Sequence, residues 1–191
     1  MPPKAKFTRE AIIQAGLDII RENGMEALSA RALGTKLGSS ARPVFTIFQN
    51  MDEVQAEVKK AAKSLYAEYV KKGLEQELAF KGVGTQYIRF AVQEPKLFQL
   101  LFMSEQTQNP AVVNVLPMID DNYEDILLSV QNGYHLSGEQ AELLYRHLWI
   151  YTHGIAVLCA TNMCVFTAEE INRMIAQVCR GVLKEMQKDT E

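Results

Sequence analysis

Apolar residues recur every three or four positions along most of the chain, and this spacing is the period of an α-helix. No segment convincingly alternates apolar and polar residues in the way that half-buried β-strands do. We therefore predict an all-α fold of about nine helices. The expected helices cover residues 8–23, 30–37, 41–49, 51–73, 85–94, 95–103, 111–131, 139–160 and 168–185.

Local signals predict where several of these helices begin. Asn50 with Glu53, and Thr167 with Glu170, form capping-box patterns, in which each partner can satisfy a backbone amide of the other. Pro95 interrupts one apolar segment and can start the next, because a first-turn residue needs no amide hydrogen.

Other signals predict where helices break or end. Gly82 and Gly84 are expected to separate two helices, since glycine weakens a helix interior. Pro117 should bend or restart the helix over residues 111–131. The Asn132-Gly133 pair is expected to close that helix.

Residues 29–50, SARALGTKLGSSARPVFTIFQN, have the outline of a helix-turn-helix. Ser29 is a good N-cap for a first helix, in which Leu33 begins an i, i+4 apolar pair. Gly38 lies where a helix can end with a positive φ, and Ser40 can cap the second helix. The segment therefore predicts two short helices joined by a tight turn.

The expected second helix has two distinct faces. Val44 and Phe48 lie four residues apart and should point inward. Pro43 falls in the first turn, where a missing amide is tolerable, but a proline disfavours a helical conformation of Arg42 before it. The residues expected to point outward are Ala41, Arg42, Phe45, Thr46 and Gln49.

This amino-terminal segment resembles the DNA-binding domain of the TetR family of bacterial transcriptional repressors. The resemblance is carried by a first helix that ends in ENG, by LSARALGTKLGSS and by ARPVFTIFQN. The remaining chain resembles the family's other half in size and helix count, and LWIYTHGIAVL is similar to the penultimate helix of some members. The sequence departs from the family pattern at Ile47, where an aromatic residue or His is usual, and at Met51, where many members have Lys.

The resemblance implies two domains with different roles. Residues 1–50 would bind DNA, and residues 51–191 would bind an effector and dimerise. The charges agree with this division, because residues 1–50 carry seven Lys/Arg against four Asp/Glu, whereas the remaining 141 residues carry 13 against 19. A basic head on an acidic body suits a protein that presents one end to a polyanion.

In a helix-turn-helix, the second helix lies in the major groove with its first residues against the base edges. Arg42 is the best candidate for a bidentate contact to guanine, and Thr46 can bond a base or pack its methyl group on thymine. Phe45 has two possible roles, a contact to DNA or packing within the head. The full set of expected DNA-contacting residues is Lys6, Arg31, Ser40, Ala41, Arg42, Phe45, Thr46 and Gln49.

The body is rich in aromatic and methionine side chains, which, as the resemblance implies, could line an apolar pocket for a small effector. Ordinary core packing explains the same helical spacing, and it is the commoner role for any single residue. A histidine in the position of His153, one turn after Trp149, more often packs between helices than contacts a ligand. The expected effector-binding residues are Phe90, Phe98, Phe102, Met118, Tyr123, Trp149 and His153.

The last two helices, over residues 139–160 and 168–185, have apolar residues on more than one side. Gly154 and Ala156 would allow another helix to approach closely. Because a two-fold dimer can read a palindromic operator, we expect a four-helix dimer interface made by these helices. The expected interface residues are Ile150, Gly154, Val157, Leu158, Met174 and Val178.

The three cysteines, Cys159, Cys164 and Cys179, are an odd number, which favours reduced thiols over a secreted disulfide framework. Cys159 and Cys164 would lie about 140° apart on one unbroken helix, so such a helix would not direct both at one metal ion. A redox or metal sensor is therefore a minor alternative. No cofactor or metal is predicted.

The sequence contains no catalytic motif that we can defend, so no catalytic residue and no enzyme activity is predicted. It also has no apolar run of membrane-spanning length and no signal-peptide pattern at its start, so we expect a cytoplasmic protein that does not contact a membrane. The preferred function is a homodimeric DNA-binding regulator, a repressor that a small apolar or amphipathic effector releases from a palindromic operator. The alternative is a helical protein-interaction or ligand-carrier module whose amino-terminal hairpin is structural.

Overall fold

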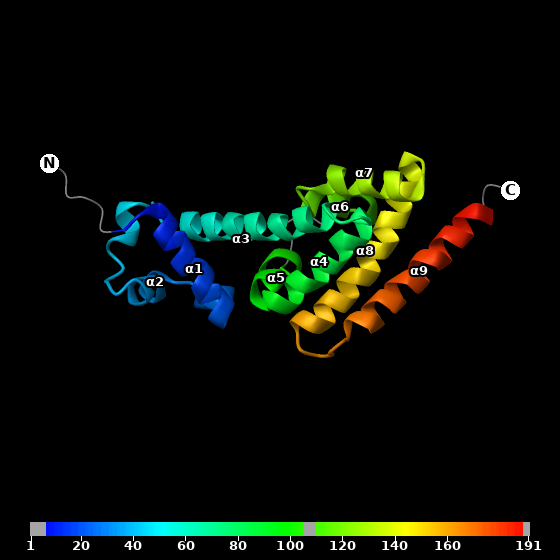
Figure 1. The fold of residues 1–191 in the computed structure, drawn as a ribbon. Coiled ribbons are helices and arrows are strands. Elements are labelled where there is room, and N and C mark those ends of the chain that lie inside the picture. Colours follow the sequence, from blue (N-terminus) through cyan, green and yellow to red (C-terminus); the bar gives the residue numbers. More distant parts are fainter. Residues whose placement is uncertain (1–6, 105–109, 189–191) are drawn as a thin grey trace. The chain divides into compact units, whose positions relative to one another are not determined.

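A computed structural model describes residues 7–104 and 110–188 of the chain. Within these residues all regular structure is helical, which confirms the predicted all-α class (Figure 1). The α-helices are α1 (Arg9–Asn23), α2 (Ala30–Lys36), α3 (Met51–Leu74), α4 (Ala79–Gln93), α5 (Pro95–Phe102), α6 (Val112–Ile119), α7 (Tyr123–Tyr134), α8 (Gly138–Ala160) and α9 (Ala168–Lys188). Two short 3₁₀ helices, η1 (Met25–Ala27) and η2 (Val44–Thr46), lie between α1 and α3.

The chain forms two compact units. The first unit comprises Met1–Tyr66 and Glu94–Ser104, and the second comprises Ala67–Gln93 and Glu105–Glu191. Helix α3 contributes residues to both units. The predicted boundary at residue 50 divides the chain by role, and that division stays a prediction.

In the first unit, α1 packs against α2, η1 and α5. Apolar side chains from these elements and from α3 form its core, because each helix keeps one apolar stripe at the helical period. The largest fully buried members are Ile12, Ile20, Leu33, Val44, Phe48, Val54, Val58, Leu97 and Phe98.

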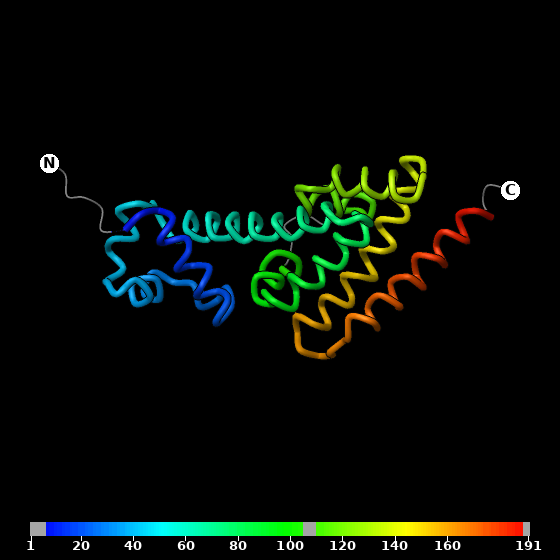
Figure 2. The backbone as a smooth tube through the Cα atoms, in the orientation of Figure 1, coloured from blue at the N-terminus to red at the C-terminus, as the bar shows by residue number. Residues whose placement is uncertain are grey.

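In the second unit, α4 packs against α7 and α8, α8 also packs against α9, and α6 packs against α7. Phe90, Ile126 and Leu144 are fully buried between these helices. The chain reverses between α8 and α9 through the orange turn in Figure 2, so these two helices run alongside each other.

The start of α4 differs from the prediction. The helix begins at Ala79, so Gly82 and Gly84 lie inside it and do not separate two helices. A Cβ atom built at Gly73 would lie 2.6 Å from the backbone of Val83, and a Cβ atom built at Gly82 would press on the carbonyl oxygen of Gly73. Gly73 and Gly82 therefore permit the end of α3 and the start of α4 to touch, a tertiary reason that a local breaker rule misses.

The predicted helix over residues 111–131 is two helices, and the break lies at Asp120 instead of Pro117. The Asp120 carboxylate accepts hydrogen bonds from the backbone amide and the side-chain amide of Asn122, which turns the chain there. Helix α7 continues through Asn132-Gly133 to Tyr134 and ends where His135 adopts a left-handed φ of 55°. The prediction that Asn132-Gly133 ends this helix is therefore wrong.

Candidate nucleic-acid interface and ligand site

The first half of the expected helix-turn-helix is built as its sequence predicts. The Ser29 hydroxyl accepts a hydrogen bond from the Ala32 amide at 3.2 Å, so Ser29 caps α2. Leu33 is fully buried beneath the helix. After α2, Gly38 has a φ of 62°, and the Ser39 amide donates to the carbonyl of Gly34.

The turn after α2 depends on a glycine inside the helix. A Cβ atom built at Gly34 would lie 2.8 Å from the Ser40 carbonyl carbon and 2.9 Å from the Ala41 nitrogen. Real Cβ atoms do not approach a backbone so closely, so only glycine lets the chain fold back across α2. The tight turn between the two halves therefore needs both Gly34 and Gly38.

The second half is not the α-helix that we predicted. After Pro43 the chain makes a single 3₁₀ turn, Val44–Thr46, and Ser40 makes no N-cap hydrogen bond to it. Pro43 has no amide hydrogen to donate, and it disfavours a helical conformation of the residue before it, so an α-helix cannot extend back through Arg42.

The two faces of this 3₁₀ segment agree with the sequence pattern. Val44 and Phe48 are buried, with no more than 2% of either side chain exposed. Phe45 is 46% exposed, Arg42, Thr46 and Gln49 are also exposed, and Ala41 is half-buried. The Thr46 hydroxyl donates to the Pro43 carbonyl at 2.7 Å, so its hydrogen supports the turn while its oxygen can still accept a bond.

The start of α3 holds the end of the 3₁₀ segment. Glu53 accepts from the Gln49 amide at 2.7 Å and from the Arg9 guanidinium at 2.8 Å, and its own amide donates to Asn50. The Gln49 amide, followed by Arg9, lowers the pKa of Glu53. Arg9 also lies 4.4 Å above the Phe48 ring, a cation–π contact. The predicted capping box is confirmed at Asn50, with the Gln49 amide in place of the Asn50 amide as its reciprocal donor.

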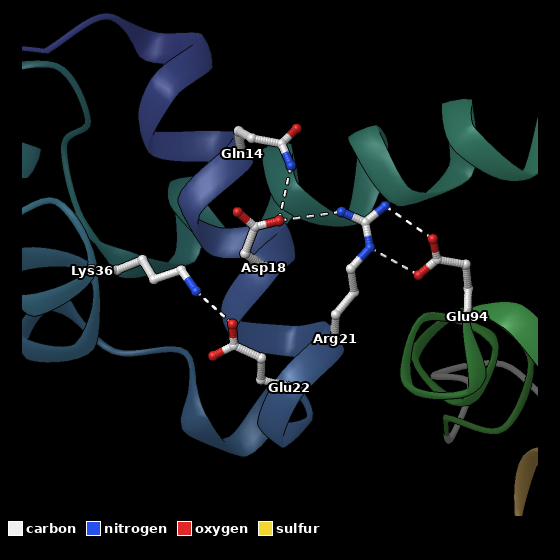
Figure 3. A network of polar contacts seen from close by, with 6 residues as sticks. All are labelled: Gln14, Asp18, Arg21, Glu22, Lys36 and Glu94. Carbon is white, nitrogen blue, oxygen red and sulfur yellow. Dashed lines mark hydrogen bonds and ion pairs between the residues drawn. The ribbon is translucent and has the colours of Figure 1, made fainter.

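A polar network that the sequence pattern missed lies on α1 (Figure 3). Arg21 forms a two-pronged ion pair with Glu94 at 2.8 and 3.1 Å and also reaches Asp18, which accepts from Gln14. Glu22 pairs with Lys36 of α2. Arg21 and Glu94 lie 73 residues apart, so no local sequence signal could have joined them.

These ion pairs distinguish the cations of the head. Residues 7–50 contain five Lys and Arg, of which Arg9, Arg21 and Lys36 are paired with carboxylates. Among the residues described, Arg31 and Arg42 are exposed and form no ion pair. They are the cations of this segment whose charge is available to an outside anion. Lys6, also predicted to contact DNA, lies outside the described residues.

In the second unit, three ring side chains contact one another in sequence, one from α4 and two from α8. The Tyr87 hydroxyl and Nδ1 of His153 are 2.9 Å apart and hydrogen-bonded. The His153 ring in turn stacks on Trp149, with ring centroids 5.2 Å apart and planes 21° from parallel. Burial lowers the pKa of His153, which favours its neutral imidazole.

Asp120 gives this region a negative charge that sequence reasoning missed. It is only 6% exposed, and its charge, after burial, raises the pKa of both Tyr87 and Tyr145. Tyr145 stacks on Tyr123, with centroids 5.8 Å apart. The arrangement places buried and half-buried aromatic rings next to a few fixed polar groups.

The structure does not bring all the expected effector-binding residues together in one unit. Phe90, Met118, Tyr123, Trp149 and His153 belong to the second unit, where Phe90 is buried and Met118 is exposed. Phe98 and Phe102 belong to the first unit, and their ring centroids lie 5.2 Å apart. An additional ring contact joins Phe102 to Tyr66 of the same unit.

The expected dimer residues lie on α8 and α9. Ile150 is 50% exposed, and Gly154, one turn later, is exposed with no atom within 4 Å of a built Cβ. The other four, Val157, Leu158, Met174 and Val178, are half-buried. Their role as an interface stays a prediction.

Two negative findings concern the described residues. In that part of the chain, no three His, Cys, Asp or Glu side chains are grouped closely enough to hold a metal ion. None of the helices within residues 7–104 and 110–188 combines the length and the apolar character that crossing a membrane requires.

Comparisons with known proteins agree with this architecture. Residues 80–182, more than half of the chain, match the family model described as "Tetracyclin repressor-like, C-terminal domain". The sequence matches no curated protein. A solved structure from Mesorhizobium loti MAFF303099, assigned to the TetR family of transcriptional regulators, has a similar fold with a TM-score of 0.55. The likeness covers 93% of this chain and 98% of that one at 16% identity.

Proposed function

Because the chain belongs to the TetR family of transcriptional regulators, we propose that it binds a palindromic operator as a homodimer and represses transcription until an effector releases it. The observation that carries the proposal is the pairing pattern of the head, which leaves Arg31 and Arg42 exposed and without a carboxylate partner among the described residues. Binding to chromosomal DNA places this activity in the cytoplasm.

Arg42, Phe45, Thr46 and Gln49 form the proposed base-contacting surface. Arg31 and Ser40 are the proposed phosphate contacts, because a cation and a hydroxyl next to a turn can fix the register on the duplex without reading sequence. Lys6 and the half-buried Ala41 complete the proposed set. Arg42 is the strongest candidate for sequence discrimination, since a guanidinium can bond two acceptors of one guanine.

The test begins with selection of bound duplexes from a random DNA library. Arg42→Ala should then weaken binding to the selected duplex by about 1–3 kcal/mol and relax the preference at one base pair of each half-site. Arg89→Ala is the matched control, because Arg89 is an exposed arginine of α4, outside the head. This control should bind the duplex like the parent.

Salt separates the proposed regulator from a helical carrier or interaction module. Phosphate contacts release counterions, so the logarithm of the affinity for the selected duplex should fall linearly and steeply with the logarithm of salt concentration. If the selection recovers no preferred duplex, the chain does not recognise a DNA sequence. If Arg42→Ala binds the selected duplex as the parent does, Arg42 does not contact a base.

The proposed effector site is the aromatic cluster of Tyr87, Tyr123, Trp149 and His153, and the proposed effector is small and apolar or amphipathic. Phe90 and Met118 are the other proposed members from the second unit. Phe98 and Phe102, which belong to the first unit, are left out of this cluster, and their expected effector contact stays a prediction. A compound that releases the chain from its selected duplex identifies the effector.

Calorimetry on that compound tests the site. Tyr87→Phe removes the hydroxyl that bonds His153 and should weaken effector binding by about 1 kcal/mol, roughly fivefold. Tyr69→Phe removes a hydroxyl that bonds Gln93 in the same unit and serves as the control. If Tyr87→Phe and Tyr69→Phe bind the compound with equal affinity, the effector site does not include the Tyr87 hydroxyl.

A further inference from the structure

Helix α8 ends in a turn that returns the chain onto its own last residues. The Met163 amide donates to the Leu158 carbonyl at 3.0 Å, and the Asn162 amide donates to the Cys159 carbonyl at 3.1 Å. Asn162 has a left-handed φ of 55°. This pair of bonds around a left-handed residue is a Schellman motif, a common way to end a helix with its last carbonyls satisfied.

The turn changes the relation between two cysteines. On an unbroken helix Cys159 and Cys164 would point in different directions, but α8 ends at Ala160, between them. The Cys164 amide donates to the Leu158 carbonyl, one residue before Cys159, at 3.3 Å. The backbone at Cys164 is therefore folded back onto the helical turn that carries Cys159.

The environments of the two thiols differ in a useful way. Cys164 is exposed and Cys159 is half-buried. The pKa of Cys159 is raised, first by burial and second by the charge of Cys164. The third cysteine, Cys179, is buried, and its thiol donates to the Tyr134 hydroxyl.

We propose that Cys164 and Cys159 are a reversible dithiol–disulfide pair, with Cys164 as the attacking thiol and Cys159 as the resolving thiol. The oxidant is a low-molecular-weight disulfide. The exposed Cys164 thiolate attacks one sulfur of this disulfide, forms a mixed disulfide and releases one small thiol. The Cys159 thiolate then attacks the Cys164 sulfur, which forms the intrachain disulfide and releases the second small thiol.

The step is balanced and easily reversed. Two protein thiols are oxidised, one small disulfide is reduced to two thiols, and the protons of the protein thiols end on the thiols released. The new disulfide closes a loop of only a few residues, so it gains little from restriction of the unfolded chain. It therefore suits a switch that excess small thiol returns to the reduced state.

The sequence offers a direct test, because cyanogen bromide cleaves after methionine. Cleavage after Met118, Met163 and Met174 places the three cysteines on separate fragments, namely residues 119–163, 164–174 and 175–186. The full-length protein is equilibrated with mixtures of oxidised and reduced glutathione, its remaining thiols are alkylated, and it is cleaved. We expect fragments 119–163 and 164–174 to stay joined until a reductant is added.

Intact mass and single-cysteine variants sharpen the result. The oxidised parent should lose about 2 Da, the mass of two hydrogen atoms, and should migrate as a single chain on a non-reducing gel. Cys159→Ser should stop at a mixed disulfide between Cys164 and one glutathione. Cys179→Ser is the matched control and should form the linked fragments as the parent does.

Two outcomes would overturn the proposal. In the first, the parent accumulates glutathione on Cys164 but its fragments separate without reductant, which shows that Cys159 cannot reach Cys164. In the second, fragments 119–163 and 164–174 are linked only in material that migrates as two chains, which shows that the disulfide joins two molecules. Neither outcome depends on DNA binding, so the proposed regulatory function is tested separately.

Discussion

Gly34 shows how a single hydrogen atom in place of a methyl group shapes the candidate DNA-binding surface. Gly34→Ala would place a Cβ atom against the backbone of Ser40 and Ala41, which has no flexible side-chain atom to move aside. We expect the variant to lose about 1–3 kcal/mol of unfolding free energy, a typical cost of overpacking, in urea titrations. Binding to the selected duplex should weaken with it, because the turn must shift.

Gly84→Ala is the matched control for that change. Gly84 lies inside α4, and nothing lies within 4 Å of a Cβ built there. Alanine is the better helix former, so this variant should gain about 0.5–1 kcal/mol. Destabilisation by Gly84→Ala equal to that by Gly34→Ala would show that the close approach at Gly34 is not the cause.

His153 predicts a pH dependence of stability. Burial lowers its pKa in the folded protein below the ordinary value of 6.5, so the unfolded chain binds the proton more tightly. Above pH 6.5 the residue is neutral in both states, and its contribution is constant. As the pH falls from 6.5 toward the folded-state pKa, this residue progressively lowers the unfolding free energy.

The measurement compares unfolding free energies at about pH 7.5 and about pH 5.5. His153→Gln should lose less stability between these values than the parent does. His147→Gln is the control, since His147 is an exposed histidine of the same helix. Its pH dependence should match that of the parent, and identical profiles for all three proteins would contradict the assignment to His153.

At the scale of elements, the Arg21–Glu94 ion pair joins α1 to the residue before α5 (Figure 3). Both side chains are mostly buried and the contact is two-pronged, a geometry stronger than an exposed pair. A double-mutant cycle with Arg21→Met and Glu94→Gln should give a coupling of about 1 kcal/mol in unfolding free energy.

The Lys188–Glu185 pair provides the comparison. It lies within α9, and more than 60% of each side chain is exposed. The corresponding cycle with Lys188→Met and Glu185→Gln should give a coupling of at most about 0.5 kcal/mol. If the coupling free energy of Arg21–Glu94 is no larger than that of Lys188–Glu185, the attraction within the Arg21–Glu94 pair does no more than offset the cost of removing its charges from water.

Helix starts were predictable because their determinants lie within three or four residues. The predicted caps at Asn50 and Thr167 both form, with the Asn50 side chain accepting from the Glu53 amide and the Thr167 hydroxyl accepting from the Glu170 amide. Such bonds depend on spacing along the chain alone, so the sequence contains all the information that they need. The inward positions Val44 and Phe48 followed from helical period in the same way.

Features that depend on distant residues were not predictable. The close approach of Gly73 to Gly82 requires a glycine inside α4, and the Arg21–Glu94 pair spans 73 residues. The 3₁₀ turn at Val44–Thr46 is a different case, because Pro43 is a local signal in the sequence against an α-helix through Arg42. The contact of Tyr87 with His153 likewise needed the packing of α4 on α8.

At the scale of the whole molecule, the proposed dimer predicts a mass of twice 21.5 kDa. Ile150→Arg places a charge on an exposed aliphatic site of α8, beside the space at Gly154. If α8 and α9 form the interface, light scattering at micromolar concentration should show this variant shifting toward one chain, because an unpaired buried charge is costly.

Val92→Arg controls for the added charge. Val92 is 57% exposed on α4, outside the proposed interface helices, and its variant should keep the mass of two chains. A parent that scatters as one chain would exclude the homodimer. A dimer that Ile150→Arg leaves intact would place the interface on another surface.

The stack of Trp149 on His153 gives the protein an internal optical reporter. Trp149 is the single tryptophan among 191 residues, so all indole emission of the molecule comes from one point between α4 and α8. Its wavelength follows the polarity around the ring, and its intensity follows contact with the imidazole. An unlabelled sample in a fluorimeter therefore reports on the proposed effector site alone.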